Sequence, residues 1–179
     1  MATASQRFFS VYIGKNDPEN LKKYFCVTMT TYLFIALILI IISETLGLWF
    51  VNNKLVIPTE RKTAALWIYQ FSIIGFLFTV MVTPFMSSII AHENMNVYAY
   101  VSIIEVGLRL AVVYLLKLFL IDKLFLYGLL LLGVAVINSS LYFVYSVVHY
   151  EECRLKFLWN KKIFVEISSY TGWNLMGSI

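Results

Sequence analysis

The residues best suited to chemistry are two charges in the middle of an apolar stretch. Residues 97–121, VYAYVSIIEVGLRLAVVYLLKLFLI, carry Glu105 and Arg109 among aliphatic and aromatic side chains. A charge at the centre of a bilayer costs about 2.5–3.5 kcal/mol, so charges at that depth usually face a protein interior or a water-filled cavity. Because the two residues are four positions apart, a helix places them on one face, where they can form an ion pair.

Further polar residues extend this face of the helix. At about 100° per residue, Tyr98, Ser102, Glu105 and Arg109 fall within an arc of roughly 60°. Asn138, on the polar face of a later helix, is a further candidate for the same cavity. We predict that these five residues line a cavity, in which the Arg109 guanidinium would attract a negatively charged group. The alternative is a structural ion pair that fastens the helix to a neighbour.

A second polar stripe contains a proline. The hydroxyl residues of this stripe share one helical face within roughly 80° and are Ser72, Thr79, Thr83 and Ser87. They could line a substrate path, but small hydroxyl residues more often permit close helix packing in membranes. Pro84 interrupts the same helix and is a hinge candidate, with a static kink as the equal alternative. We expect nearby hydroxyls to satisfy the carbonyl that the proline frees.

Metal and catalytic centres are not indicated. His149 and Cys153 are four residues apart and could share a helical face, but no second pair of ligands accompanies them. His92 likewise lacks a nucleophile at a recognisable spacing. We therefore expect no catalytic residue, no metal and no cofactor, and we do not expect an enzyme.

The elements that must position these residues are transmembrane helices. The chain has 179 residues, of which 60% are hydrophobic and only 13% are charged, about half the charged share of a soluble domain. Four long apolar runs predict an all-α, polytopic transmembrane helix bundle with spans at about 25–51, 63–91, 97–121 and 124–148. Residues 1–162 would form a partial N-terminal bundle, and residues 163–179 the truncated beginning of a fifth span.

The basic residues suggest an orientation in the membrane. The formal net charge is +4, but the basic residues cluster between apolar runs, which favours cytoplasmic loops over a nucleic-acid partner. One side of the predicted bundle carries eight Lys and Arg residues and the other side five. The positive-inside rule therefore places residues 1–24, 92–96 and 149–162 in the cytoplasm.

The order of several segments resembles one family. These segments are SQRFFSVYIGKNDPENLKKYF, ETLGLWFVNNKLVIPTERKTAALWIYQFSI, PFMSSIIAHENMNVYAYVSIIEV and HYEECRLKFLWNKKIFVEISSYTGWNLMGSI. They are similar to the bacterial polysaccharide-biosynthesis, Wzx-like flippases of the MOP superfamily, which also contains the MATE multidrug exporters. The resemblance covers essentially the whole chain. It implies a longer parent with two helical bundles around a cavity, of which this chain would be spans three to six and part of seven.

The resemblance implies transport. The expected substrate is a lipid-linked oligosaccharide on undecaprenyl diphosphate, moved by alternating access across the bacterial inner membrane, with membrane lipids and a coupling ion as further partners. On this resemblance, Arg109 would attract the diphosphate or sugar-acid charges of the substrate, and the hydroxyl stripe could line the path of its sugars. A multidrug or organic-cation exporter of the same fold is the nearest alternative. An integral-membrane enzyme of glycan assembly is an alternative from another class, although the short loops speak against it. The last alternative is an inactive truncated scaffold.

Overall fold

The protein is all-α, as predicted. The computed structural model describes residues 2–54, 58, 61–118, 123–154 and 160–177, and within these ranges it contains helices and no strand. The elements are α1 (Ala2–Gly14), α2 (Pro18–Ile42), η1 (Ser43–Gly47), α3 (Leu48–Asn53), α4 (Lys62–Ala91), α5 (Met95–Leu118), α6 (Lys123–His149), η3 (Glu151–Cys153) and α7 (Lys161–Gly177).

Four of the described helical stretches are long and apolar enough to cross a membrane. They are Pro18–Asn53, Lys62–Ala91, Met95–Leu118 and Lys123–His149. The chain is therefore a multi-pass membrane protein. The first span begins with α2 at Pro18, seven residues before the predicted start, and continues through η1 and α3 without a break. The end of the predicted span 97–121 and part of the predicted loop 149–162 lie outside the described residues.

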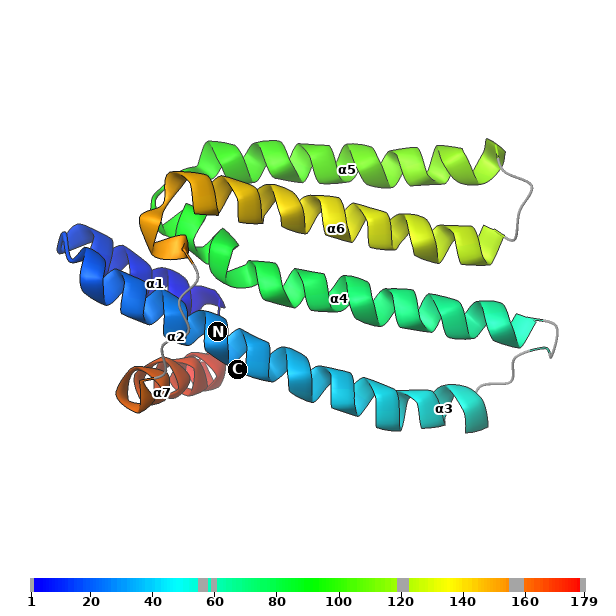
Figure 1. Ribbon diagram of the computed structural model, residues 1–179, viewed down its shortest axis with the longest axis horizontal. Coiled ribbons are helices and arrows are strands. Elements are labelled where there is room, and N and C mark those ends of the chain that lie inside the picture. The colour runs from blue at the N-terminus through cyan, green and yellow to red at the C-terminus, as the bar shows by residue number, and fades with distance from the viewer. Residues whose placement is uncertain (1, 55–57, 59–60, 119–122, 155–159, 178–179) are drawn as a thin grey trace.

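The spans run side by side along the long axis of the molecule (Figure 1). The turn between α1 and α2, the turn between α4 and α5, and η3 all lie at one end of the bundle, which we call the α1 end (Figure 1). The turn between α1 and α2 extends beyond the start of α5 and the end of α6. The described parts of the three predicted cytoplasmic segments thus lie at the same end, while the assignment of that end to the cytoplasm stays a prediction.

Short-range backbone chemistry ends α1 and starts α2. The Asn16 N–H donates to Ile13 O and the Asp17 N–H donates to Tyr12 O, a Schellman arrangement in which Asn16 has φ 51°. Asp17 then caps α2 by accepting the Asn20 N–H at 3.1 Å, and Pro18 occupies the first turn. α1 is not among the elements that the sequence predicted.

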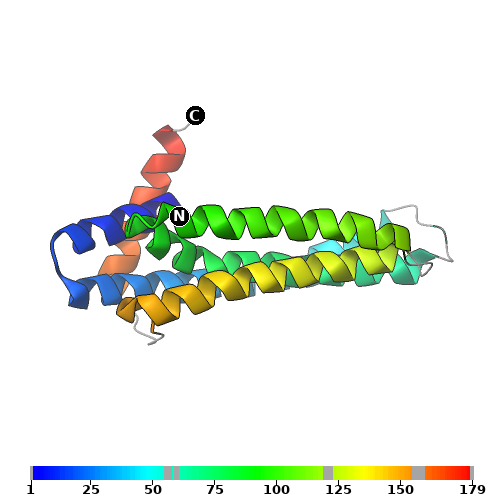
Figure 2. The ribbon, with the colours of Figure 1, turned by 90° about the horizontal axis from the view of Figure 1, so that it is seen from above.

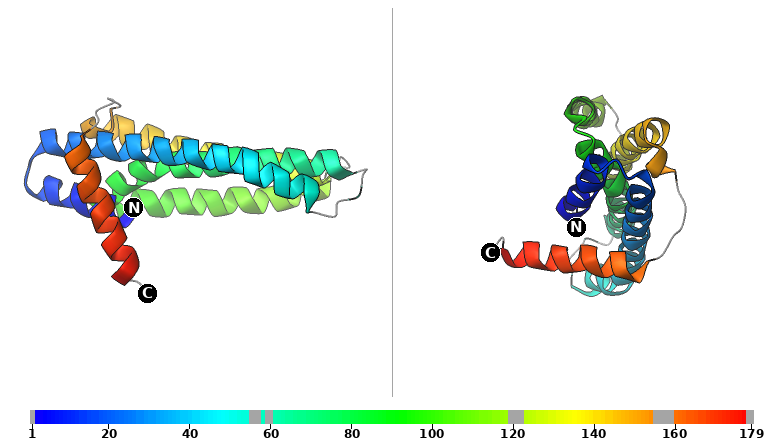
Figure 3. Two further views of the ribbon diagram at one scale, coloured as in Figure 1. Left: turned by 90° about the horizontal axis from the view of Figure 1, so that it is seen from below. Right: turned by 90° about the vertical axis from the view of Figure 1, so that its left-hand side faces the viewer.

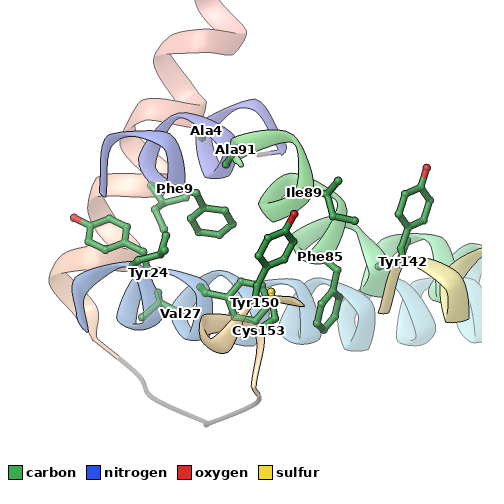
Figure 4. Close-up of a cluster of buried hydrophobic side chains, with 14 of the residues drawn as sticks. Ala4, Phe9, Tyr24, Val27, Phe85, Ile89, Ala91, Tyr142, Tyr150 and Cys153 are labelled. Carbon is green, nitrogen blue, oxygen red and sulfur yellow. The ribbon is translucent and has the colours of Figure 1, made fainter. Parts of the chain in front are cut away.

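Buried hydrophobic side chains are concentrated at the α1 end. Figure 4 shows Phe9 of α1, Val27 of α2, Phe85 of α4 and Cys153 of η3 converging there. The Phe85 ring lies 5.4 Å from the Phe25 ring in an edge-on arrangement, a geometry that aromatic pairs prefer. This cluster joins α1, α2, α4, η3 and α7 into one packed core.

α7 runs across the bundle rather than along it (Figures 2 and 3). It buries Ile163 and Ile167 against the core and exposes Trp173 and Met176. A fifth span starting at residue 163 stays a prediction, and residues 178–179 lie outside the described part of the chain.

Helices α4 and α6 approach each other closely because small residues lie between them. A Cβ added at Gly128 of α6 would lie 2.9 Å from Ile68 Cγ1 and 3.4 Å from Ile68 Cα. A Cβ on Gly75 of α4 would lie 3.6 Å from the Ala135 side chain. Small interfacial residues are a common basis of helix packing in membranes. The α4–α6 pair is the support against which α5 is held.

Candidate functional site

A groove of about 420 Å³ lies between α4, α5 and α6. We call it the central groove. All five predicted candidates line it: Tyr98, Ser102, Glu105, Arg109 and Asn138. The helical spacing that placed four of them on one face of α5 therefore brings them to one surface, and α6 adds Asn138.

Glu105 and Arg109 form an ion pair. Arg109 donates to Glu105 Oε1 from Nη2 at 2.7 Å and from Nε at 3.0 Å. The Arg109 side chain is 63% exposed, whereas the Glu105 side chain is 28% exposed. The groove thus presents the guanidinium more openly than the carboxylate, which lies deeper between the helices.

Asn138 connects this pair to α6. Its Nδ2 donates to Glu105 Oε2 at 2.9 Å. Its Oδ1 is buried and has no hydrogen-bond partner among the described residues. An unsatisfied buried acceptor costs about 1–3 kcal/mol. The unpaired Oδ1 therefore offsets part of what the hydrogen bond from Nδ2 to Glu105 contributes.

Two tyrosines form the part of the groove nearer the α1 end. The Tyr98 and Tyr142 rings lie 6.5 Å apart and are tilted by 33°. Tyr142 is 3% exposed and Tyr98 is 37% exposed. The Ser102 hydroxyl donates to Tyr98 O at 2.8 Å. Tyr98 is the more exposed of the two rings and offers a stacking surface in the groove.

The hydroxyl stripe of α4 divides between the groove and the core. Ser72, Thr79 and Thr83 line the central groove, whereas Ser87 is buried. The Thr83 and Ser87 hydroxyls donate to the carbonyls of Thr79 and Thr83. These acceptors differ from the Val80 carbonyl that Pro84 leaves without its helical donor.

Pro84 lies in the buried core and not in the groove lining. Figure 1 shows α4 bending toward its C-terminal end, the part of the helix that contains this proline. A bend next to tightly packed aromatic residues fits a kink and leaves the hinge role a prediction.

The sequence did not predict the polar contacts between α4 and η3. His92 Nε2 donates to Glu152 Oε1 at 2.6 Å, and the His92 ring stacks on Tyr150 at 4.1 Å. Burial acts to raise the pKa of the Glu152 carboxyl, but the hydrogen bond from His92 and weaker interactions outweigh it, so this pKa lies below its usual value. These contacts fasten the turn after α6 to the end of α4.

Cys153 lies beside these contacts but has no nucleophilic character. Its Sγ donates to Ser88 Oγ at 3.6 Å, and burial raises the pKa of the thiol to about 12. A thiolate is the reactive form of cysteine. Within the described ranges, no three His, Cys, Asp or Glu side chains form a group that could hold a metal ion.

Comparisons of the chain with known protein families, with curated proteins and with solved structures find no match. The four spans define a multi-pass membrane protein, and its central groove is lined by Glu105, Arg109 and Asn138.

Proposed function

We propose that the chain belongs to a membrane transport protein that moves a lipid-linked oligosaccharide, carried on a polyprenyl diphosphate, across the bacterial inner membrane. The central groove is one wall of the path. Transport proceeds by a change in helix packing around a site at mid-membrane depth and involves no bond chemistry. The α1 end faces the cytoplasm, where the more basic loops belong.

The observation that carries this proposal is the open guanidinium of Arg109 in the central groove. A guanidinium binds phosphate oxygens through paired N–H groups and keeps its charge at all physiological pH values. Asn138 holds the Glu105 carboxylate, and this carboxylate in turn accepts hydrogen bonds from Arg109. The Arg109 guanidinium is therefore oriented before a ligand arrives. Tyr98, about three helical turns along α5 from Arg109, supplies a surface for a sugar ring in the same groove.

An organic-cation exporter is the second candidate, because the groove also contains a carboxylate and two tyrosines. A cation would have to reach Glu105, but Arg109 and Asn138 already donate to both of its oxygens. Binding a cation there would compete with the three charge-assisted hydrogen bonds that this carboxylate accepts. The present arrangement therefore favours an anionic ligand.

The test reconstitutes the full chain in vesicles that contain a fluorescent, sugar-bearing polyprenyl diphosphate. Chemical quenching of the outer leaflet measures movement between leaflets. Losing one charge-assisted contact to the diphosphate should slow Arg109→Gln about 10- to 100-fold. Arg109→Lys should be intermediate because it keeps the charge and loses the paired geometry.

Lys117→Gln is the matched control, since it removes a cation from the end of the same helix. Its rate should equal that of the unchanged chain. An Arg109→Gln chain that moves the lipid at the full rate would show that the ion pair is structural. Movement of a quaternary ammonium dye, lost in Glu105→Gln and kept in Arg109→Gln, would favour the exporter.

A further inference from the structure

A second groove lies at the α1 end, far along the chain from the residues of the central groove. Its volume is about 480 Å³ and it is formed by α1 and α7. We call it the α1–α7 groove. Its lining combines two cations with aromatic rings and includes Arg7, Lys15, Tyr12, Tyr170 and Trp173.

Both cations of this groove are placed over aromatic rings. The Arg7 guanidinium carbon lies 4.5 Å from the centre of the Tyr170 ring, and Lys15 Nζ lies 5.7 Å from the centre of the Tyr12 ring. The rings fix the positions of two side chains that would otherwise sample many rotamers. Arg7 therefore connects the two helices that form the groove, because it belongs to α1 and lies over the Tyr170 ring of α7.

The charge balance of the groove favours an anion with one negative charge. Glu166 also lines it, and this carboxylate accepts a hydrogen bond from the Tyr24 hydroxyl on the side of α2. Two cations and one carboxylate leave a formal charge of +1. The ion pairs formed within the described ranges are Lys23–Glu19, His92–Glu152 and Arg109–Glu105, so neither Arg7 nor Lys15 is neutralised by one of them.

The position of α7 matches the surface of a bilayer. It crosses the bundle at the end where the spans meet their loops (Figures 2 and 3). Its Ile163 and Ile167 are buried against the protein, while Trp173 is 71% exposed and Met176 is 76% exposed. Tryptophan is enriched at the level of lipid headgroups, and helices that lie in this plane keep apolar side chains toward the acyl chains.

We propose that the α1–α7 groove binds the headgroup of an anionic phospholipid, with the phosphate between Arg7 and Lys15 and the acyl chains along the exposed Trp173 side of α7. A phospholipid uses both features of the groove, its charge and its apolar rim, whereas a soluble anion would use only the cations. This site is separate from the central groove, and it holds whether or not the chain transports a lipid-linked sugar.

Native mass spectrometry of the full chain in a neutral detergent tests the proposal. It measures binding of the first molecule of phosphatidylglycerol and of phosphatidylcholine, with inorganic phosphate as a competitor. Each Lys or Arg near an anionic lipid surface contributes favourably to the free energy of binding. Because it loses two such residues, the double variant Arg7→Gln/Lys15→Gln should bind phosphatidylglycerol about 30-fold more weakly. Phosphatidylcholine binding should be weaker at the outset and unchanged by the variant.

Two controls make the result specific. Lys54→Gln removes another cation that lies over an aromatic ring, 5.9 Å from Trp49 and outside the α1–α7 groove, and it should leave phosphatidylglycerol binding unchanged. Ser169→Phe keeps every charge but fills the groove, and it should weaken binding.

Three results would overturn the proposal. The first is equal binding of the two lipids by the unchanged chain. The second is unaltered phosphatidylglycerol binding in the double variant or in Ser169→Phe. The third is displacement of the lipid by inorganic phosphate at equal concentration, which would indicate a free-anion site.

Discussion

Glu93 holds a backbone conformation that most side chains avoid. Its φ is 59°, because it follows α4 in a Schellman arrangement where its N–H donates to Ile90 O and the Asn94 N–H donates to Ile89 O. A residue with a Cβ loses about 1 kcal/mol there relative to glycine. We predict that Glu93→Gly raises the free energy of unfolding by about that amount, measured by thermal unfolding in detergent.

Asn16 is the internal control for this prediction. It occupies the equivalent position after α1 with φ 51°, and asparagine tolerates this conformation better than glutamate does. Asn16→Gly should therefore stabilise by less than Glu93→Gly. Equal effects at both positions would indicate that chain entropy, and not local strain, governs them.

The two cysteines should be unreactive in the folded protein. Cys26 is 2% exposed and Cys153 is 0% exposed. Burial raises the pKa of the Cys153 thiol to about 12, so much less of it is ionised at pH 8 than of an ordinary thiol. We predict no labelling by a maleimide under native conditions and two labels in denaturant, counted by mass spectrometry. Glu151→Cys, at an exposed position of the same turn, should add one label under native conditions; native labelling of the unchanged chain would contradict the burial of both thiols.

At this scale the sequence predicted what lies within one helix. The Glu105–Arg109 pair follows from their spacing, because positions four apart on a helix meet. The hydrogen bond from Asn138 to Glu105 depends on the axial offset between α5 and α6, which no local pattern encodes. The pairing of His92 with Glu152 was missed for the same reason, since 60 positions of chain separate them.

Close packing of α4 and α6 makes Gly128 sensitive to substitution. An added Cβ would meet both the Ile68 side chain and the Ile68 backbone. We predict that Gly128→Ala lowers the free energy of unfolding by about 1–3 kcal/mol because the helices must separate. Gly133 lies on the same helix with open space around it, so Gly133→Ala should be neutral or stabilise by up to about 1 kcal/mol. Equal effects of both changes on the unfolding transition would argue against the close approach.

The contact between η3 and α4 should weaken in acid. The pKa of Glu152 is lowered in the folded state, so its carboxylate stabilises the fold above the unfolded-state pKa of about 4.5. This contribution is lost as the pH falls through the lower, folded-state pKa. We predict that the unfolding temperature of Glu152→Gln varies less than that of the unchanged chain between about pH 5 and pH 3. Parallel curves for the two proteins would assign the acid sensitivity to other carboxyls.

Among the elements, the spans could be predicted and the short helices could not. Twenty or more apolar residues identify a span from composition alone. α1 has 13 residues of mixed character, and its helical form depends on burying Phe9 and Ala4 against α2 and α4. The direction of α7 likewise depends on burying Ile163 and Ile167 in that core. This core forms only when the helices of the bundle have assembled.

For the whole molecule, the central groove implies two environments on α5. Ser102 lines the groove, whereas the adjacent Ile103 is 68% exposed on the outer surface. We predict that a charged, water-soluble thiol reagent labels Ser102→Cys and leaves Ile103→Cys unlabelled in vesicles, because only the groove admits water. Val106→Cys, at a position that is 66% exposed, is a second control for the outer surface. Equal labelling of Ser102→Cys and Ile103→Cys would mean that the polar face of α5 does not line a water-filled groove.

The core cluster at the α1 end also determines which part of the bundle should separate first during thermal unfolding. Its aromatic side chains tie α1, α2 and α4 together, while the opposite tip of α2 is fastened to α4 by a hydrogen bond from Tyr69 to Ser43 O. Spin labels at that tip should therefore report separation of α2 from α4 at temperatures where circular dichroism is still constant. Unfolding would then begin with separation of intact helices, and the helices themselves would lose their secondary structure only at higher temperature.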